Sequence, residues 1–283
     1  MYVGRFAPSP TGPLHFGSLV AALASWLDAR AAGGRWLVRI EDLDPPREQA
    51  GAADEILRSL EHLGLCWDGP VVFQSDRNQL YEAAIEKLKK HAYWCGCSRS
   101  EVADSSLGLA ADGAQIYPGT CRDGLPPGRS PRALRLKVVN ESISFADRVQ
   151  GRVEQHLARE VGDFVLLRAD RQFAYQLAVV ADDAAQGVSD VVRGADLLGS
   201  TARQIFLQRL LGIPTPRYLH VPAAVDAAGE KLSKQTGAGA VAQADLRRAL
   251  LFLGQKETDD PAEAVRNWNP SLIPARRARA APR

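Results

Sequence analysis

The feature that most constrains the fold is a strand–helix–strand pattern in the first part of the chain. Residues 2–6 (YVGRF) form a short apolar run that predicts a strand, and residues 35–42 (RWLVRIED) predict a second one. Between them, residues 19–34 (LVAALASWLDARAAGG) favour a helix that closes on Gly33 and Gly34, a common helix ending. Strands joined through one helix run parallel, with a right-handed crossover. The sequence therefore predicts an α/β fold built on a parallel sheet.

The pattern continues along the chain with one interruption. We expect further helices at residues 48–63, 77–91, 201–212 and 244–254, mixed α/β structure over 163–194 and a strand over 217–225. Residues 104–132, in contrast, are rich in Ser, Gly, Asp and Pro, and short strands resume only at 133–139 and 142–145. A loop of that length inside a compact domain requires a function or a cross-link.

Composition indicates an ordinary globular protein. Hydrophobic residues make up 46% of the chain and charged residues 24%, and the formal net charge of +2 is too small to argue for nucleic-acid binding by itself. The basic residues at the end of the chain favour a solvated, disordered tail, with contact to a phosphate backbone as the alternative; they are Arg276, Arg277, Arg279 and Arg283. We expect no transmembrane helix, no signal peptide and no disulfide scaffold, hence a cytoplasmic protein.

Residues 8–18 (PSPTGPLHFGS) lie where the first helix begins. Prolines fix the backbone there, while Gly12 and Gly17 allow it to approach a ligand closely. His15 and Ser18 are three residues apart and so face one side of the first helical turn. A helix N-terminus attracts anions such as phosphate. Taken alone, the stretch favours a structural turn with a helix cap, and a phosphate site is the alternative.

Residues 230–235 (EKLSKQ) place two lysines, Lys231 and Lys234, on either side of a Leu-Ser pair in a glycine-rich loop. A lysine on such a loop suits a leaving or transferring phosphate. Taken alone, this stretch too favours a solvated loop.

Together, the two stretches resemble the paired signature of class I aminoacyl-tRNA synthetases. HFGS stands where that class has its His-x-Gly-His element, and KLSKQ stands where it has Lys-Met-Ser-Lys-Ser. RFAPSPTGPLHFGS is very similar to the glutamyl branch of the class, and the resemblance covers residues 1–240 in order. The departures are Ser18 in place of the second His and Gln235 in place of the last Ser.

The resemblance implies a Rossmann-like α/β catalytic domain with a zinc-containing α+β insert and a short helical C-terminal segment. Residues 1–91 and 161–240 would be the two halves of the catalytic domain, and residues 92–160 would be the insert. Residues 241–283 would be the helical segment and the basic tail, with no anticodon-binding domain, because 236–283 is shorter than the roughly 50 residues of a small domain.

The resemblance also implies an amino-acid site and an ATP site. The residues that would hold glutamate are Arg5, Ser9, Glu41, Tyr175 and Arg193. Two arginines and one carboxylate suit a ligand with one ammonium and two carboxylates better than they suit glutamine. Those that would hold ATP, accompanied by Mg²⁺, are His15, Gly17, Ser18, Lys231 and Lys234. His15 and Lys234 would be catalytic, stabilising the α-phosphate in the transition state.

Three cysteines, Cys95, Cys97 and Cys121, bracket most of the irregular stretch. Thiolates at this spacing favour one structural zinc ion, and three reduced free thiols are the alternative. By chemistry alone, the candidates for a fourth ligand are His91, Asp112 and Asp123. The Cys-x-Cys…Tyr-x3-Cys spacing resembles a short paralogous family, the glutamyl-queuosine tRNA(Asp) synthetases, and that resemblance implies Tyr117. Cys66 is expected to be a small buried residue.

The short C-terminus and the cysteine spacing both favour this paralogous family. The implied reaction activates L-glutamate with ATP, without tRNA, and transfers glutamate to the queuosine base in the anticodon of tRNA(Asp). The implied partners are L-glutamate, ATP and that anticodon stem-loop, with no membrane partner and a monomeric state. The alternatives are a truncated canonical glutamyl-tRNA synthetase that charges a tRNA 3′ end, an adenylyltransferase of the same superfamily, and a non-catalytic zinc-stapled RNA-binding module.

Overall fold

The computed structural model describes residues 1–226, 229 and 244–282. The first part of the chain forms the strand–helix–strand unit that the sequence predicts: β1 (Val3–Phe6), α1 (Phe16–Ala31) and β2 (Arg35–Ile40). β1 pairs with β2 in parallel, and β2 pairs in parallel with the short β3 (Val72–Phe73). α2 (Ala52–His62) lies between these two strands in the chain.

A second sheet forms from later segments. Its strand order is β7 (Gly151–His156), β6 (Ser142–Asp147), β10 (Arg217–Val221) and β9 (Asp190–Gly194). β10 runs parallel to both β6 and β9, whereas β6 and β7 form an antiparallel hairpin. The N–H of Ser189 donates to the carbonyl of Val3 at 3.0 Å, so β9 starts directly beside β1. α6 (Tyr175–Ala185) precedes β9 in the chain, and α7 (Thr201–Leu211) lies between β9 and β10.

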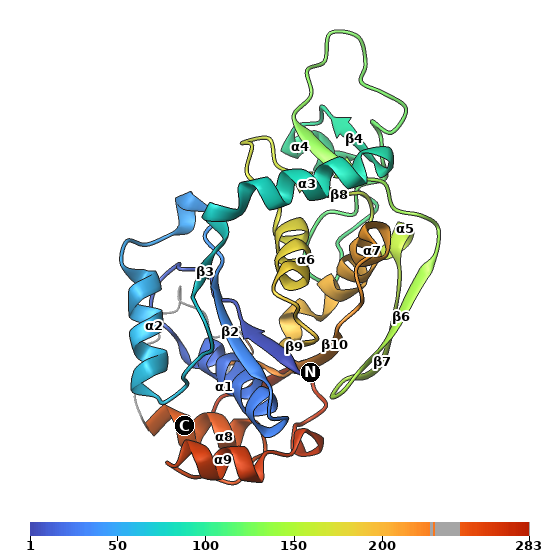
Figure 1. Cartoon of the computed structure of the whole chain (residues 1–283). Helices are drawn as coiled ribbons and strands as arrows, with labels where there is room; N and C mark the ends of the chain where they lie inside the picture. Colours follow the sequence, from blue (N-terminus) through green and yellow to red (C-terminus); the bar gives the residue numbers. More distant parts are fainter. Residues whose placement is uncertain (227–228, 230–243, 283) are drawn as a thin grey trace.

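A third sheet lies at the top of Figure 1, and its first strand ends at Cys95. It is antiparallel, in the order β4 (Ala92–Cys95), β5 (Ala133–Leu136) and β8 (Phe164–Leu167). α3 (Asn78–Leu88) and α4 (Arg99–Asp104) lie beside it in Figure 1, whereas α5 (Leu157–Glu160) contacts β7. β5 and β6 come before residue 160, whereas their partners β8 and β10 come after it. Strand pairs therefore cross the predicted division at residue 160. The four-part division itself stays a prediction.

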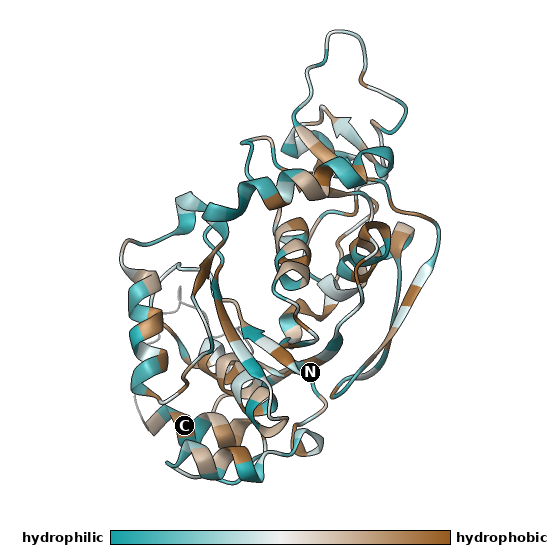
Figure 2. Cartoon of the chain, viewed as in Figure 1, coloured by the Kyte–Doolittle hydropathy of each residue, from teal (hydrophilic) through white to brown (hydrophobic). Residues whose placement is uncertain are grey.

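The remaining elements are short helical turns and the C-terminal helices. The 3₁₀ turns are η1 (Pro45–Arg47), η2 (Gln74–Arg77), η3 (Lys89–His91), η4 (Ala195–Ser200) and η6 (Pro270–Leu272). α8 (Ala244–Phe252) and α9 (Pro261–Asn267) pack below α1 in Figure 1. They share one apolar core with α1, β1 and β2, and a second core lies among α3, α6, α7 and β8. Hydrophobic residues of these elements, brown in Figure 2, supply the two cores.

The expectation of a disordered basic tail is wrong for the described part of that tail. β12 (Ala278–Ala280) pairs in parallel with β11 (Ala223–Val225). The guanidinium of Arg279 lies 5.5 Å from the ring centre of Phe252 and donates to that residue's carbonyl. The free edge of β11 supplies hydrogen-bond partners that a solvated tail would lack, and a three-residue strand carries too little periodicity to be predicted.

Two smaller expectations also need correction. β7, of sequence GRVEQH, was not predicted because four of its six residues are polar and only one is apolar, which removes the alternating pattern. Cys66 is exposed rather than buried. Its carbonyl, not its thiol, is the structural group, because it accepts hydrogen bonds from Trp26 Nε1 and from Arg30 Nη2.

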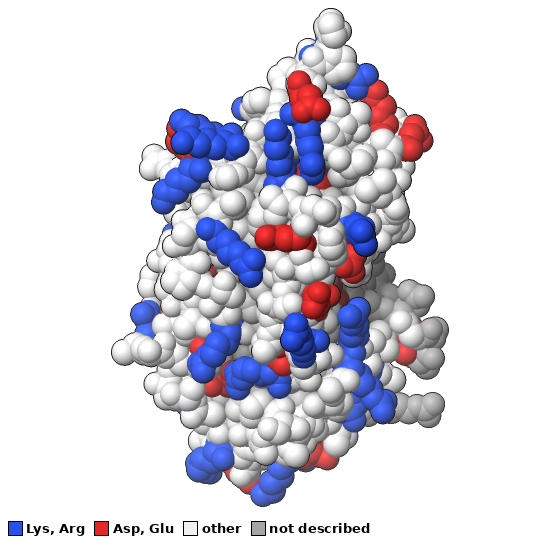
Figure 3. Space-filling view, turned by 90° about the vertical axis from the view of Figure 1, so that its right-hand side faces the viewer, with Lys and Arg blue, Asp and Glu red and all other residues white. Residues whose placement is uncertain are grey.

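Charge is mixed on the face of the molecule in Figure 3, where basic side chains are spread from top to bottom with acidic ones between them. This agrees with the small net charge of +2. Among the helices in residues 1–226 and 244–282, none is long and apolar enough to cross a membrane.

Candidate active site

A cavity of about 560 Å³ opens at the carboxyl ends of the parallel strands β1, β2, β9 and β10. Crevices at this edge of a parallel sheet are the usual ligand sites of α/β folds. The described residues that the sequence singles out for glutamate and ATP all line this cavity; they are Arg5, Ser9, His15, Gly17, Ser18, Glu41, Tyr175 and Arg193. Lys231 and Lys234 lie outside the described residues.

One wall of the cavity is the N-terminus of α1. His15 is the N-cap residue, and its Nδ1 accepts a hydrogen bond from the N–H of Ser18 at 3.3 Å. The hydroxyl of Ser18 lies 2.9 Å from Nε2 of the same ring. Gly12 has φ of 136°, a backbone conformation that side chains disfavour, and it turns the chain toward the helix. The predicted helix cap is therefore confirmed, and several residues of the same stretch line the cavity. The phosphate site stays a prediction.

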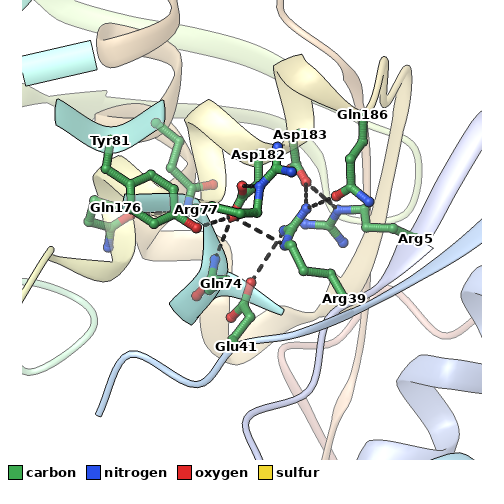
Figure 4. Close-up of polar contacts among 11 residues, drawn as sticks. Arg5, Arg39, Glu41, Gln74, Arg77, Tyr81, Gln176, Asp182, Asp183 and Gln186 are labelled. Carbon is green, nitrogen blue, oxygen red and sulfur yellow. Dashed lines mark hydrogen bonds and ion pairs between the residues drawn. The ribbon is translucent and has the colours of Figure 1, made fainter. Parts of the chain in front are cut away.

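Arg5 and Glu41 are joined by a buried ion-pair network, drawn in Figure 4. Nε of Arg5 donates to Asp183 at 3.1 Å. Nη1 of Arg39 donates to the same carboxylate at 2.8 Å, and Nη2 of Arg39 donates to Glu41 at 3.3 Å. The fully buried guanidinium of Arg39 thus connects Arg5, through Asp183, with Glu41.

A second carboxylate supports this guanidinium from behind. Oδ2 of Asp182 lies 3.7 Å from Nε of Arg39. Asp182 also accepts hydrogen bonds from Gln74, Arg77 and Tyr81 at 2.6 to 2.8 Å. Three arginines and three carboxylates therefore balance within the network of Arg5, Arg39, Glu41, Arg77, Asp182 and Asp183.

Sequence reasoning missed Arg39, Asp182 and Asp183. A usable signal was present, because two adjacent acidic residues interrupt an otherwise apolar helix at residues 175–185. Charged residues inside such a helix are rarely buried unless they are paired. The partner could not be read from the sequence, since Arg39 and Asp183 are far apart in the chain.

Burial shapes the protonation of these groups. Burial raises the pKa of Glu41 above its ordinary value, although Arg39 and Arg5 act in the opposite direction. Burial also acts to raise the pKa of Asp183, but Arg5 and Arg39 together hold it below its ordinary value. The pKa of Tyr175 is raised by burial, so this cavity residue keeps its phenolic hydrogen at neutral pH. A cationic ligand group beside Glu41 would oppose this effect of burial and favour its charged form.

Arg193 approaches the cavity from β9 and is 5% exposed. Its Nη2 donates to the hydroxyl of Thr201 at 2.9 Å, and its Nε donates to Nε2 of His220 at 3.0 Å. Within the described part of the chain, its Nη1 is buried and has no hydrogen-bond partner. A buried donor without a partner is uncommon, so Nη1 is the nitrogen of Arg193 whose hydrogen bonding the described residues do not satisfy.

Away from the cavity, the three cysteines near β4 converge with Tyr117. The sulfur atoms of Cys95, Cys97 and Cys121 lie within 4.8 Å of one another. The hydroxyl of Tyr117 is 3.4 Å from the sulfur of Cys95 and 3.3 Å from that of Cys97. The guanidinium of Arg135 lies over the Tyr117 ring, 4.1 Å from its centre. Three sulfur atoms and one hydroxyl oxygen are therefore clustered, and the guanidinium of Arg135 lies beside them.

Comparison with known proteins finds relatives that match most of the chain. The catalytic-domain model of the class I tRNA synthetases for E and Q (glutamate and glutamine) matches residues 2–252. A protein of Dechloromonas aromatica named glutamyl-Q tRNA(Asp) synthetase is 62% identical over 260 residues, which are 90% of this chain and 86% of that protein. One of the same name from Verminephrobacter eiseniae is 62% identical over 257 residues, 89% of this chain and 87% of that protein.

Among solved structures, the chain resembles a glutamate tRNA ligase from Elizabethkingia meningosepticum in complex with its amino acid. The TM-score is 0.82 at 23% identity, covering 99% of this chain and 67% of that one, so the likeness shows a shared fold. The fold is therefore that of the class I catalytic domain, a mixed α/β architecture. By identity and coverage, the chain belongs to the glutamyl-Q tRNA(Asp) synthetases, within the class I tRNA synthetases for glutamate and glutamine.

Proposed function

We propose that this chain is an ATP-dependent ligase that activates L-glutamate without tRNA and transfers it to the queuosine base in the anticodon of tRNA(Asp). The observation that carries the proposal is the charge pattern of the cavity, which Arg5, Arg193 and Glu41 line together with the N-terminus of α1. The family supplies the acceptor, because the similar proteins are named for tRNA(Asp) and for the Q nucleoside.

In the proposed amino-acid site, Glu41 pairs with the ammonium of glutamate, while Arg5 and Arg193 each donate to a carboxylate. Ser9 and Tyr175 add hydroxyl groups to the same cavity. Glutamine would leave one arginine facing a neutral amide, so it should bind less well. An adenylyltransferase without an amino-acid substrate would have no use for such a set of charges.

In the activation step, an oxygen of the glutamate α-carboxylate attacks the α-phosphorus of ATP. The bond from that phosphorus to the bridging oxygen breaks, and pyrophosphate leaves with the electron pair. His15 and the first N–H groups of α1, together with Lys231 and Lys234, would stabilise the charge that develops on the phosphate. Mg²⁺ bound with ATP would neutralise part of the phosphate charge. A queuosine hydroxyl oxygen then attacks the carbonyl carbon of the adenylate. The bond from that carbon to the phosphate oxygen breaks, AMP leaves with the electron pair, and the hydroxyl proton passes to a phosphate oxygen or to solvent.

The cysteine cluster supports a proposed structural zinc ion. Zn–S bonds of about 2.3 Å in a tetrahedron place sulfur atoms about 3.8 Å apart, and the sulfurs of Cys97 and Cys121 are 3.6 Å apart. The backbone N–H of Cys121 donates to the Tyr117 hydroxyl oxygen at 3.2 Å, a hydrogen bond that would also stabilise a phenolate oxygen at this position. Cys95, Cys97, Tyr117 and Cys121 would hold the ion and cross-link the irregular stretch 104–132.

Exchange of radioactive pyrophosphate into ATP tests the activation step. With no RNA added, we expect exchange that depends on glutamate and is much weaker with glutamine or aspartate. Exchange driven by another amino acid, or only in the presence of tRNA, would contradict the proposed site.

A second experiment tests the acceptor. Radiolabelled glutamate is offered to tRNA pools from cells with and without queuosine, and nuclease fragments locate the label. We expect label on the anticodon stem-loop fragment of queuosine-containing tRNA. Label at the 3′ end of either pool would instead identify a canonical glutamyl-tRNA synthetase. ATP, glutamate and tRNA occur together in the cytoplasm, where we expect the protein to act as a monomer.

A further inference from the structure

Three buried side chains, Asp147, His220 and Arg193, form a hydrogen-bonded chain across three adjacent strands. Oδ2 of Asp147 on β6 lies 2.6 Å from Nδ1 of His220 on β10. Nε2 of the same histidine accepts a hydrogen bond from Nε of Arg193 on β9 at 3.0 Å. All three are buried, with His220 fully inaccessible. The parallel register of β9 and β10 creates this contact, because His220 pairs directly with Arg193.

Each nitrogen of the His220 ring has a defined role in this arrangement. Nδ1 faces a carboxylate and must therefore carry the hydrogen. Nε2 faces the Nε–H of an arginine that is always protonated and must therefore present a lone pair. Burial lowers the pKa of His220 to about 4, with Arg193 adding to the effect and Asp147 opposing it. The ring is thus neutral, with one hydrogen, near neutral pH.

Asp147 is itself held rigidly. Its Oδ1 accepts hydrogen bonds from the backbone N–H groups of Val149, Gln150 and His220 at 2.8 to 3.2 Å. These bonds orient the other carboxylate oxygen toward the imidazole. A carboxylate fixed in this way can dictate which nitrogen of a neighbouring histidine is protonated.

Arg193 is held on one side by this chain and by Thr201, which leaves Nη1 as the nitrogen without a partner among the described residues. We propose that Asp147 and His220 are positioning residues, which fix the imidazole tautomer so that Arg193 keeps one guanidinium nitrogen for a substrate carboxylate. The inference rests on the proposed function for the identity of that substrate. It also gives β6, a strand from the stretch predicted as an insert, a role at the amino-acid site.

The isosteric variant Asp147→Asn tests the proposal. An asparagine amide would donate to Nδ1 and force the hydrogen onto Nε2, where it would face the Nε–H of Arg193. In pyrophosphate exchange, we expect the KM for glutamate to rise about tenfold or more, because two donors then oppose each other in a buried site. The KM for ATP and kcat should remain close to those of the wild type.

Asp190→Asn is the matched control. Asp190 is also buried and lies on the same strand as Arg193, but it pairs with Arg217. We expect this variant to keep the wild-type KM for glutamate. Equal increases in the two variants, or a fall in kcat with KM unchanged in Asp147→Asn, would overturn the positioning role.

Two substitutions of the histidine separate its two hydrogen bonds. His220→Asn can still donate to Asp147 but leaves the Arg193 Nε–H without an acceptor, whereas His220→Gln places a carbonyl near the position of Nε2. We expect the KM for glutamate to rise more in His220→Asn than in His220→Gln. The reverse order would contradict the proposal.

Nitrogen NMR of ¹⁵N-histidine protein tests the tautomer without any substrate. The chain has five histidines, and the signals missing from His220→Gln assign the ring. We expect Nδ1–H in the wild type and Nε2–H in Asp147→Asn. An Nε2–H wild-type ring would overturn the inference even if glutamate is the substrate. An Nδ1–H ring in a protein without glutamate-dependent exchange would instead count against the proposed function.

Discussion

Glu41 supplies the negative charge with which the proposed amino-acid site would meet an ammonium group. Its side chain is 8% exposed and lies against Arg39. Because burial outweighs the effect of the nearby arginines, its pKa is raised above the ordinary value. Glu41 therefore loses its charge at a higher pH than an exposed glutamate would.

This protonation should be visible in kinetics. We expect the KM for glutamate to rise as pH falls, starting above the ordinary glutamate pKa of about 4.3. The sign follows because Glu41 pairs with the ammonium only when it is deprotonated, and a raised pKa moves its loss of charge to higher pH. Pyrophosphate exchange over a pH series measures the effect. Glu41→Gln should bind weakly but without this pH dependence. A wild-type KM that begins to rise only below the ordinary glutamate pKa of about 4.3 would refute the expectation.

His15 has two roles that one substitution can separate. We expect His15→Ala to lower kcat for exchange by roughly tenfold or more, as expected for the loss of a group that stabilises transition-state charge. Loss of the N-cap should destabilise the fold by only about 1 kcal/mol. Urea unfolding and exchange measure the two effects.

Asp260→Ala provides the control for His15→Ala. Asp260 caps α9, where its carboxylate accepts from the N–H of Ala262 at 2.9 Å, and it does not line the cavity. It should lose similar stability and keep full exchange. If His15→Ala behaves in the same way, the phosphate role is wrong.

Among the elements, β2 and α6 hold the buried ion-pair network of Arg39, which positions Glu41 at the cavity. Residues two apart on an extended chain face the same side, which directs Arg39 and Glu41 toward each other at the end of β2. α6 then presents Asp182 and Asp183 to the same guanidinium. A single arginine therefore couples the position of a strand end to that of a helix.

Removal of that arginine should affect both stability and binding. We expect Arg39→Met to destabilise the protein by about 3–5 kcal/mol, because it leaves buried carboxylates without their partner. The KM for glutamate should rise as well, since Glu41 and Asp183 both lose a contact. Arg77→Met is the matched control, because Arg77 pairs with Asp182 but with neither Glu41 nor Asp183. It should cost less stability and leave the KM unchanged; equal KM changes in both variants would argue against this coupling.

For the whole molecule, the proposed zinc ion would hold the irregular stretch 104–132 to the sheet of β4, β5 and β8. We expect metal analysis of freshly purified, unchelated protein to find about one zinc per chain. Cys121→Ala should lose the metal and lower the thermal stability. Cys66→Ala should keep both, because Cys66 is exposed and is not part of the cluster. Wild-type protein that is fully folded without zinc would exclude a structural metal.

Much of this architecture could be predicted because its signals are local. The period of the apolar residues, the cap at Gly33 and the proline–glycine turn at residues 8–18 all act within a few positions of the chain. The helix N-terminus after residues 8–18 indicated a phosphate site as an alternative, and the resemblance to a known family named the described residues that line the cavity. β7 and β12 escaped prediction because one lacks an alternating pattern and the other is only three residues long.

The sequence by itself determined the α/β class, the parallel pairing of the first two strands and the set of side chains expected around one ligand. Only the tertiary structure decided how those side chains are held. Arg39 meets Asp183, and Asp147 reaches Arg193 through His220, across separations in the chain that no periodic pattern reports. The physical reason is that a buried charge requires a partner, but sequence can show only that the requirement exists. Strand register and helix packing determine which distant residue meets it.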